Sequence, residues 1–207
     1  MKYTGPSCRL CRREGEKLFL KGDKCLSQKC PLLKKNYAPG QHGNKGKFKK
    51  MSEFGRQLRE KQKAKRIYQL TEKTFSGYYK KAVARKGVTG TIMLQIIELR
   101  LDNVIYRAEF AASRKQSRQL VGHGLLKVNG RKCSSPSRQM KIGDKITIGE
   151  SKKGKKIFEH LAKEKNSSPK WLKTDLKKGE IEIIAIPDRD DMEKSIEAQL
   201  IVEYYSK

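Results

Sequence analysis

The sequence predicts an α+β protein, with helices in its first half and a small antiparallel sheet in its second half. Three observations lead to this fold class. Apolar residues recur at spacings of three and four between residues 52 and 121, which is typical of amphipathic helices. The apolar period then changes to two, as in half-buried strands. Two pairs of cysteines near the N-terminus have the spacing of metal ligands, and they predict a metal-braced extension before the helices.

Residues 1–50 are rich in Gly, Lys and Cys and show no sustained helical or strand period, which predicts an irregular basic extension. Cys8 and Cys11 are separated by two residues, and Cys25 and Cys30 by four. Two such pairs can place four thiolates around one structural Zn²⁺, whose binding would supply the folding free energy that so few apolar residues cannot. Free thiols, disulfides formed on isolation and an iron–sulfur cluster are the alternatives.

Residues 51–90 are predicted to form a helical domain. Ser52 is a favourable N-cap residue, and apolar side chains follow it at helical spacings. Gly55 and Gly77 argue against one long helix, because glycine destabilises a helix interior. Two or three helices are therefore expected up to Lys86.

Two more helical stretches are predicted after this domain. The first extends from about Thr89 to Phe110, and the second from Ser113 to Val121. Ser113 and Gln116 fit the capping box at the start of the second stretch, and Gly122 and Gly124 supply a stop at its end.

The sheet is predicted from the alternation that follows. Leu126 and Val128 alternate with polar residues, and Asn129-Gly130 is typical of a two-residue hairpin turn. Ile146 and Ile148 repeat the alternation, and a last strand is expected at Ile181–Ile186. The two helical stretches and this sheet make up a module of residues 91–189.

Two further helices are expected late in the chain. One lies in a lysine-rich insert, where four apolar residues have amphipathic spacing: Ile157, Phe158, Leu161 and Ala162. The other is in the tail, at Met192–Val202.

Basic residues dominate the chain, with 49 Lys and Arg against 22 Asp and Glu and a formal net charge of +27. Like charge at this density destabilises a compact protein unless an anionic partner offsets it. No apolar run approaches the roughly 18 residues of a membrane span, and the N-terminus lacks the apolar stretch of a secretory signal. The expected partner is therefore a nucleic acid in the cytosol, not a membrane or a small-molecule substrate.

The charge is unevenly distributed. Residues 1–66 contain 20 Lys and Arg and 5 Asp and Glu, whereas residues 180–207 contain 3 and 8. The first third is therefore expected to face nucleic acid, and the acidic end to face away from phosphate or to meet a basic protein neighbour.

Arginines in the two module helices form the most specific candidate site. Arg100, Asn103 and Arg107 share one helix face by their spacing, as do Arg114 and Arg118 in the next helix. A guanidinium matches phosphate oxygens with two hydrogen bonds, which favours docking on a backbone of defined shape. The alternative is a solvated helix face. Apolar residues on the opposite faces are expected to attach the arginines to the sheet: Leu101, Val104, Ile105, Leu120 and Val121.

Other basic residues are further candidates for contact with RNA. Lysines in a glycine-bearing stretch are expected to become ordered only on RNA: Lys45, Lys47, Lys49 and Lys50. Four residues at helical spacings are expected to lie on a preformed surface: Arg56, Arg59, Lys63 and Arg66. Single candidates lie elsewhere at Lys34, Lys35, His42, Lys115 and Arg131. Tyr37, Phe48 and Tyr68 are candidates for stacking on bases, with ordinary packing as the alternative.

Three runs resemble the RNA-binding module named after ribosomal protein four: RLDNVIYR at 100–107, ASRKQSRQLV at 112–121 and GLLKVNG at 124–130. With the four cysteines, YAPGQHG at 37–43 and SEFGRQLREKQK at 52–63, nearly the whole chain is similar to bacterial ribosomal small-subunit protein four. The resemblance implies that the module is inserted in the helical domain, to which the tail at 190–207 returns. Some members lack the cysteines, so the resemblance assigns zinc only to a four-cysteine branch.

The resemblance also implies a function and partners. Members bind small-subunit ribosomal RNA directly, at a junction of helices in its 5′ part, early in assembly. They neighbour small-subunit protein five and influence decoding accuracy and the path by which mRNA enters the ribosome. In some bacteria they repress their own operon.

An RNA-modifying enzyme is the competing interpretation from another class. Arg100-Leu101-Asp102 is similar to the motif in which pseudouridine synthases carry their catalytic aspartate. A synthase has a separate large catalytic domain, however, whereas here the motif lies inside the module. Cys133 has no His or Asp arrangement around it in the sequence that would activate a thiol, so we expect no catalytic residue. An RNA chaperone outside the ribosome is a further alternative that uses the same surface.

Overall fold

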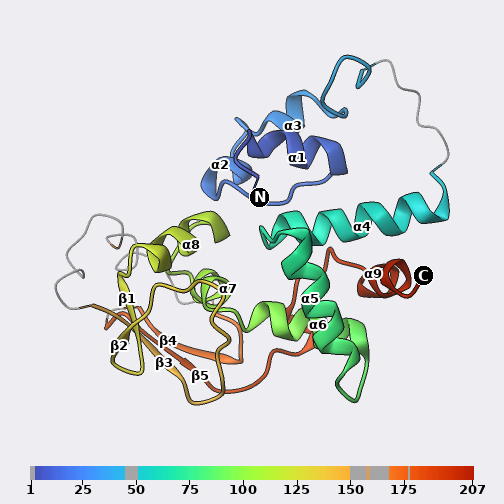
Figure 1. Ribbon diagram of the computed structural model, residues 1–207. Coiled ribbons are helices and arrows are strands. Elements are labelled where there is room, and N and C mark those ends of the chain that lie inside the picture. The colour runs from blue at the N-terminus through green and yellow to red at the C-terminus, as the bar shows by residue number, and fades with distance from the viewer. Residues whose placement is uncertain (1–2, 45–50, 150–157, 159–167, 177) are drawn as a thin grey trace. The chain divides into compact units, whose positions relative to one another are not determined.

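The computed structural model describes residues 3–44, 51–149, 158, 168–176 and 178–207 of the chain (Figure 1). The chain forms two units, which are described separately. The first contains the residues up to Met93 and Lys194–Lys207, and the second contains Leu94–Glu193. Several predicted features lie outside the described residues: the lysines Lys45, Lys47, Lys49 and Lys50, and most of the helix expected in the lysine-rich insert.

The first unit begins with three short helices, α1 (Ser7–Glu14), α2 (Asp23–Leu26) and α3 (Pro31–Lys34). The prediction that this segment has no regular structure is therefore wrong. Gly15 ends α1 in the left-handed conformation, with a φ of 77°, and its N–H donates to the carbonyl of Cys11. A helix of two turns with so few apolar residues leaves almost no periodic pattern in the sequence.

The helical domain contains α4 (Glu53–Ile67) and α5 (Glu72–Val83), within the expected number of helices. Ser52 caps α4 as predicted, because its hydroxyl accepts a hydrogen bond from Gly55 N at 3.1 Å. The break between the helices falls at residues 68–71 and not at either glycine.

The C-terminal helix α9 (Ala198–Tyr205) packs on α4 and α5 through aromatic rings. Tyr205 stacks on Tyr79 of α5 with 4.8 Å between centroids, and Tyr204 lies 5.7 Å from Phe54 of α4. The predicted tail helix was placed too early. A 3₁₀ turn occupies Arg189–Asp191, residues 192–197 are bends, turns and irregular backbone, and α9 begins only at residue 198.

Glu72 connects these three helices. Its carboxylate accepts hydrogen bonds from Lys61 Nζ at 2.9 Å, Lys65 Nζ at 3.0 Å and Tyr205 Oη at 2.7 Å. Burial raises the pKa of Glu72, but the three hydrogen bonds outweigh it and bring the pKa from 4.5 to about 2. The carboxylate form is therefore favoured in the folded state.

We expect this contact to give the first unit a pH dependence of stability. Because the folded pKa is below the unfolded one, the contribution is complete above about pH 4.5 and is lost as the pH falls toward 2. Glu72→Gln should flatten that part of the stability profile, measured by urea denaturation across pH. Glu53→Gln, at the exposed start of α4, is the control. An unchanged profile in Glu72→Gln would contradict the assignment.

The boundary between the units falls inside α6 (Thr89–Glu98), which is followed in the second unit by α7 (Leu101–Arg107). The sequence predicted one helical stretch here. The backbone breaks because the loop before the sheet's third strand takes its hydrogen bonds: Leu101 N donates to Arg138 O at 2.9 Å, and Leu99 O accepts from Met140 N at 2.8 Å. Helix α8 (Arg114–Gly122) follows with nearly the expected bounds.

The five strands of the second unit form one antiparallel sheet in the order β2-β1-β3-β5-β4. The predicted hairpin at Asn129-Gly130 is confirmed, with both residues at positive φ, 51° and 77°. The prediction did not include β4, and it extended the last strand to Ile186, whereas β5 ends at Ile183. The strands are β1 (Leu126–Val128), β2 (Arg131–Lys132), β3 (Lys145–Ile148), β4 (Leu172–Asp175) and β5 (Glu180–Ile183).

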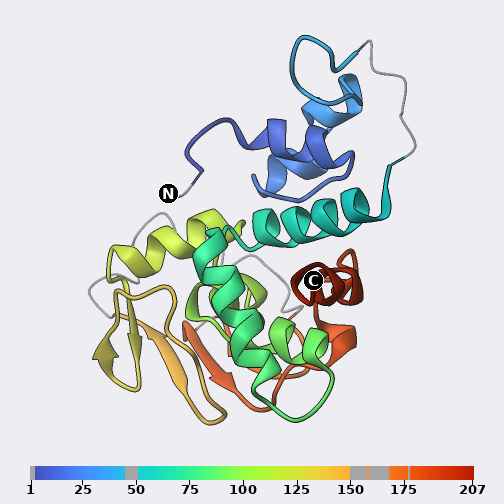
Figure 2. The ribbon, with the colours of Figure 1, turned by 45° about the vertical axis from the view of Figure 1, so that its right-hand side comes forward.

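The core of the second unit lies between the sheet and helices α7 and α8, which cover one face of it (Figures 1 and 2). Alternate strand residues such as Leu126, Ile146 and Ile181 point into this core and are almost fully buried. The mixed helical and antiparallel architecture confirms the predicted α+β class. In the described part of the chain, no helix is long and apolar enough to cross a membrane.

Candidate nucleic-acid interface

Apolar residues fix the orientation of α7 and α8. Leu101, Val104 and Ile105 of α7 have no exposed surface, and Leu120 and Val121 of α8 are also buried. This confirms the expectation that these side chains attach the two helices to the sheet. The polar side chains of both helices are therefore left on the remaining faces.

Ser113 caps α8 as the sequence predicted. Its hydroxyl accepts a hydrogen bond from Gln116 N at 3.3 Å. The return bond differs from the standard capping box, because Gln116 Oε1 accepts from Ala112 N at 2.9 Å. The start of α8, where Arg114 and Lys115 lie, is thus fixed by side chains.

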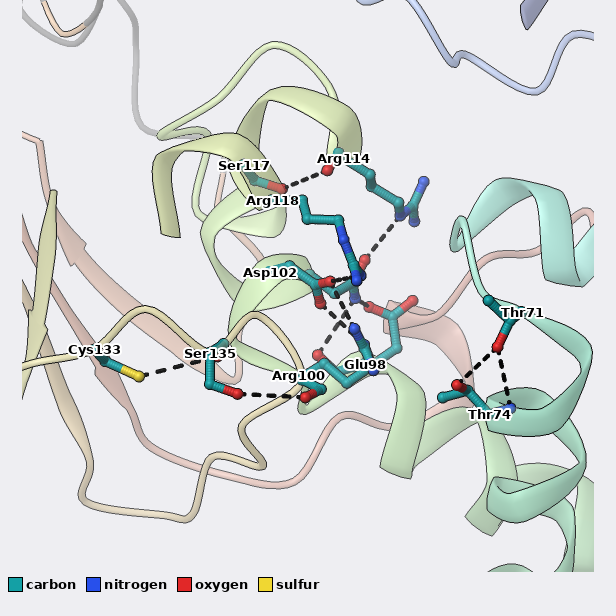
Figure 3. Close-up of polar contacts among 12 residues, drawn as sticks. Thr71, Thr74, Glu98, Arg100, Asp102, Arg114, Ser117, Arg118, Cys133 and Ser135 are labelled. Carbon is teal, nitrogen blue, oxygen red and sulfur yellow. Dashed lines mark hydrogen bonds and ion pairs between the residues drawn. The ribbon is translucent and has the colours of Figure 1, made fainter. Parts of the chain in front are cut away.

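Arg100 and Arg118 share one carboxylate, that of Asp102 (Figure 3). Asp102 accepts hydrogen bonds from Nε and Nη2 of Arg100 at 3.0 and 2.7 Å, and from Nη1 of Arg118 at 3.1 Å. Arg100 is 2% exposed, whereas the side chain of Arg118 is 31% exposed. Two guanidinium groups and one carboxylate leave a positive charge that is accessible at Arg118.

Glu98 is a second internal carboxylate, with no exposed surface. It accepts two hydrogen bonds from Arg107, Nε at 3.0 Å and Nη2 at 2.6 Å, and one from the side-chain amide of Asn103. Asn103 Oδ1 in turn accepts from Arg114 Nε at 2.8 Å. One continuous network therefore joins α6, α7 and α8.

Arg114 makes two more contacts in this network. Its Nη2 donates to Glu193 at 3.1 Å, and its guanidinium lies 4.4 Å from the centre of the Tyr106 ring. Both contacts restrict its rotation, since a guanidinium held by a carboxylate and an aromatic face has few alternative rotamers.

The structure brings together the five polar residues predicted for this site, but it buries three of them. Arg100 and Asn103 are 2% and 3% exposed, and Arg114 is 9% exposed. Internal carboxylates and an amide occupy their polar groups, so the predicted contact of these three side chains with RNA stays a prediction. Arg107 and Arg118 remain partly exposed.

The sequence did not identify the carboxylates that organise the site. In the sequence, Asp102 was noticed only as part of the Arg-Leu-Asp motif. Glu98 lies nine residues before Arg107, which is too far for a pairing within one helical turn to be expected. Glu193 lies 79 residues after Arg114 and gave no local signal at all. Two predicted residues of the module, Lys115 on α8 and Arg131 on β2, are exposed.

In the first unit, α4 directs part of its predicted basic surface toward α1. Glu14, whose side chain is 3% exposed, pairs with Arg66 Nη1 and lies 3.5 Å from Arg59 Nη1. Burial lowers the pKa of both arginines, and Arg13 nearby lowers it further. Arg13 is a basic neighbour that the sequence did not place, because α1 itself was not predicted.

Lys63 is also engaged within the first unit. Its Nζ lies 3.2 Å from Glu16 and 3.1 Å from Glu60, and only 10% of its side chain is exposed. Arg12 Nε donates to Tyr37 O at 3.0 Å, and the Arg12 guanidinium lies 4.6 Å from the Tyr37 ring centre, so this ring packs on an arginine. The remaining predicted basic residues of the described part of this unit are exposed: Lys34, Lys35, His42 and Arg56.

The four N-terminal cysteines line one cavity, together with Lys21, Lys24, Pro31 and Leu32. Burial raises the pKa of Cys11, and the proximity of the other three thiols raises it further. Lys21 N donates to Cys25 Sγ at 3.4 Å. Among the described residues, no three His, Cys, Asp or Glu side chains already converge as ligands of a metal ion. Cys133 is buried in the second unit.

Comparison with known proteins agrees with this architecture. Residues 2–98 match the family described as "Ribosomal protein S4/S9 N-terminal domain", and residues 99–146 match the "S4 domain". Three relatives bear the name "Small ribosomal subunit protein uS4", and each alignment covers 100% of this chain and 99% of the relative. They come from Clostridium botulinum (48% identical), Caldicellulosiruptor bescii (50%) and Acetivibrio thermocellus (49%). This chain belongs to the ribosomal protein S4 family.

Proposed function

We propose that this chain is a structural protein of the small ribosomal subunit that binds small-subunit ribosomal RNA directly at a helix junction. The observation that carries the proposal is the α7–α8 network, where four arginines meet three carboxylates and the excess positive charge lies at the surface. Family membership supports it, because the relatives are named as small-subunit proteins. A member of this family is a ribosomal protein and not an enzyme.

Recognition is expected to use phosphates and shape. Folded RNA has a major groove too deep and narrow for side chains, so backbone oxygens and 2′-hydroxyls are the accessible groups. Arg118, Lys115 and Arg107 would contact phosphate in the second unit, together with Arg131 on the hairpin. In the first unit, contact would come from Arg56, Lys34, Lys35 and His42, with Lys45, Lys47, Lys49 and Lys50 becoming ordered on RNA.

The internal contacts change the role proposed for the other basic candidates. Arg59 and Arg66 form ion pairs with Glu14, and Lys63 forms ion pairs with Glu16 and Glu60. These three basic residues therefore hold α4 and the N-terminal segment together, and only their remaining N–H groups would contact RNA. Arg100, Asn103 and Arg114 likewise act mainly within the protein.

A footprint on total cellular RNA tests the proposed function. We expect protection of one helix junction in the 5′ part of small-subunit ribosomal RNA, because a rigid arginine surface selects a defined backbone shape. Protection scattered over many unrelated RNAs would contradict it and favour a chaperone outside the ribosome. Co-sedimentation with small subunits at moderate salt separates these two alternatives further.

Assembly with other ribosomal proteins is part of the proposal. The acidic tail, residues 180–207, is suited to a basic protein neighbour, and small-subunit protein five is the partner that the family resemblance suggests. Early binding in assembly, a contribution to decoding accuracy and a place near the incoming mRNA follow from the same assignment, as does a cytoplasmic location.

The rival enzyme interpretation depended on Asp102. This residue is 6% exposed and accepts hydrogen bonds from two arginines, so it is not free to act as a nucleophile. We therefore assign Asp102 no catalytic role.

We also propose that Cys8, Cys11, Cys25 and Cys30 bind one structural Zn²⁺. The four thiols line one cavity. Burial raises the pKa of Cys11, and the charges of the other three thiolates raise it further, so a divalent cation bound among them would stabilise the thiolate forms. Zn²⁺ would brace α1, α2 and α3, which lack a substantial apolar core.

Zinc analysis of protein purified without chelator tests this site. We expect about one Zn²⁺ per chain, lost in Cys25→Ser and retained in Cys133→Ser, the matched control in the second unit. Affinity should fall as the pH is lowered, because protons compete for the thiolates. Far less than one equivalent in the unaltered protein, with α1 intact by hydrogen exchange, would rule the site out.

A further inference from the structure

We propose that Asp102 is a positioning residue for RNA binding, which holds the Arg118 guanidinium toward phosphate without neutralising its charge. The inference rests on the proposed function. It concerns a carboxylate inside a surface that binds a polyanion, where an acidic residue would ordinarily weaken binding. Its hydrogen bonds to Arg100 and Arg118 are the basis for a different role.

The first step is the charge of the triad formed by Arg100, Asp102 and Arg118. Arg100 alone makes a two-pronged ion pair with Asp102, with N···O distances of 3.0 and 2.7 Å. That pair is buried and balanced. Arg118 adds a single hydrogen bond of 3.1 Å to the same carboxylate, so its own charge has no further carboxylate to cancel it within the triad. Arg118 is oriented but not neutralised.

The second step is a comparison with the other arginines of the network. Arg107 makes a two-pronged pair with Glu98, and Arg114 is engaged by Asn103 and Glu193. The side chains of Arg107 and Arg114 are 18% and 8% exposed, against 31% for Arg118. Arg118 is thus the arginine of this network with the most exposed side chain. Its guanidinium carries five N–H donors, of which the bond to Asp102 uses one, so donors remain for phosphate.

The third step concerns the face of α8 on which Arg118 lies. Lys115 is one turn before Arg118 and exposed, and Gly122 is one turn after it. A Cβ added at Gly122 would meet no other atom within 4 Å, so this face is open for the approach of an RNA backbone. On α8, the position of Arg118 therefore lies between an exposed lysine and an exposed glycine.

The proposal predicts an effect opposite in sign to simple electrostatics. Asp102→Asn removes a negative charge and should strengthen binding to a polyanion if charge alone mattered. If Asp102 orients Arg118, the variant should instead bind about tenfold more weakly, because the released side chain spreads over many rotamers, and the phosphate contact does not repay the entropy lost in ordering it, so the contact is not made. The slope of log K against log salt should also decrease by about one, as expected for one lost phosphate contact.

The experiment measures binding of the full chain to deproteinised small-subunit ribosomal RNA over a range of salt concentrations. Glu180→Gln, on an exposed position of β5, is the control with the same change of charge, and we expect no loss of affinity for it. In an Arg118→Ala background, Asp102→Asn should have no further effect on affinity or slope. Affinities are corrected for the folded fraction, followed by the fluorescence of Trp171.

A second variant guards against misfolding. Asp102→Asn removes the carboxylate that pairs with the buried Arg100, and breaking a buried ion pair from one side is strongly destabilising. Arg100→Met with Asp102→Asn removes the buried pair at unchanged net charge, frees Arg118 in the same way and should show the same loss of affinity and slope.

Three outcomes are decisive. Weaker binding with a lower slope in both variants, absent in the Arg118→Ala background, is the expected result. The positioning role is overturned, while the proposed function stands, if the Asp102 variants bind as tightly as Glu180→Gln with an unchanged salt slope. It is also overturned if Asp102→Asn lowers the affinity equally in the Arg118→Ala background. If the unaltered protein shows no salt-dependent binding to this RNA, the proposed function itself fails, and the positioning role with it.

Discussion

Replacing Glu98 by alanine is expected to destabilise the second unit by about 3–5 kcal/mol, the loss typical of breaking a buried ion pair by removing one partner. Glu98 has no exposed surface and pairs with both prongs of Arg107. Its loss removes the two-pronged partner of Arg107 and the side-chain acceptor of the Asn103 amide, which retain the longer contacts with Glu193 at 3.9 Å and with the backbone carbonyl of residue 98 at 3.3 Å, respectively. The effect is therefore larger than that of any exposed carboxylate in the same unit.

Urea denaturation followed by tryptophan fluorescence measures this effect. Trp171 is the single tryptophan of the chain, is 2% exposed and lies in the second unit, so its signal reports the unfolding of that unit. Glu180→Gln serves as the control for loss of a negative charge at an exposed position. A midpoint for Glu98→Ala equal to that of the control would show that the network does not stabilise the unit.

Replacing Glu14 by alanine is expected to loosen α1 from α4. The Glu14 carboxylate is nearly buried and joins two arginines of α4, Arg59 and Arg66. These arginines are partly exposed, so the expected loss is smaller, about 2 kcal/mol after allowance for solvent screening. Arg13 should increase the effect, since the two arginines then face another positive charge without a counterion.

Hydrogen exchange of the α1 amides tests this directly. We expect faster exchange throughout α1 in Glu14→Ala, because this ion pair is a main contact between that helix and α4. Glu16→Ala is the matched control, because the Glu16 side chain is 54% exposed and forms its ion pair with Lys63 at the surface. Equal exchange in the two variants would show that Glu14 is not the attachment point.

Local chemistry predicted those parts of the fold that depend on neighbours in the sequence. The N-caps at Ser52 and Ser113 and the turn at Asn129-Gly130 each need residues within a few positions, and each appears as expected. The apolar faces of α7 and α8 follow the same logic, because helical spacing alone decides which residues share a face.

Long-range pairing explains what the sequence missed. Strand β4 has only Leu172 and Thr174 facing inward, and it is defined by its pairing with β5. The break between α6 and α7 arises because residues 136–140 take the backbone hydrogen bonds of the helix termini. Neither event has a signal within the segment concerned.

The candidate site shows the same division. Residue type and spacing placed Asn103 and Arg107 on one face of α7, but they did not reveal that this face meets Glu98. Arg100 is instead the N-cap residue of α7 and pairs with Asp102. An arginine that is free and an arginine that is paired inside the protein look alike in a sequence. Only the structure separates Arg118, which keeps accessible donors, from Arg100, which does not.

The salt dependence of binding to deproteinised small-subunit ribosomal RNA tests the central claim, that preformed cationic side chains neutralise RNA phosphates. If about 6–10 phosphates are contacted, affinity should fall by about a thousandfold or more between 50 and 200 mM salt, with a linear relation between log K and log salt. An affinity that stays nearly constant over this range would contradict the account.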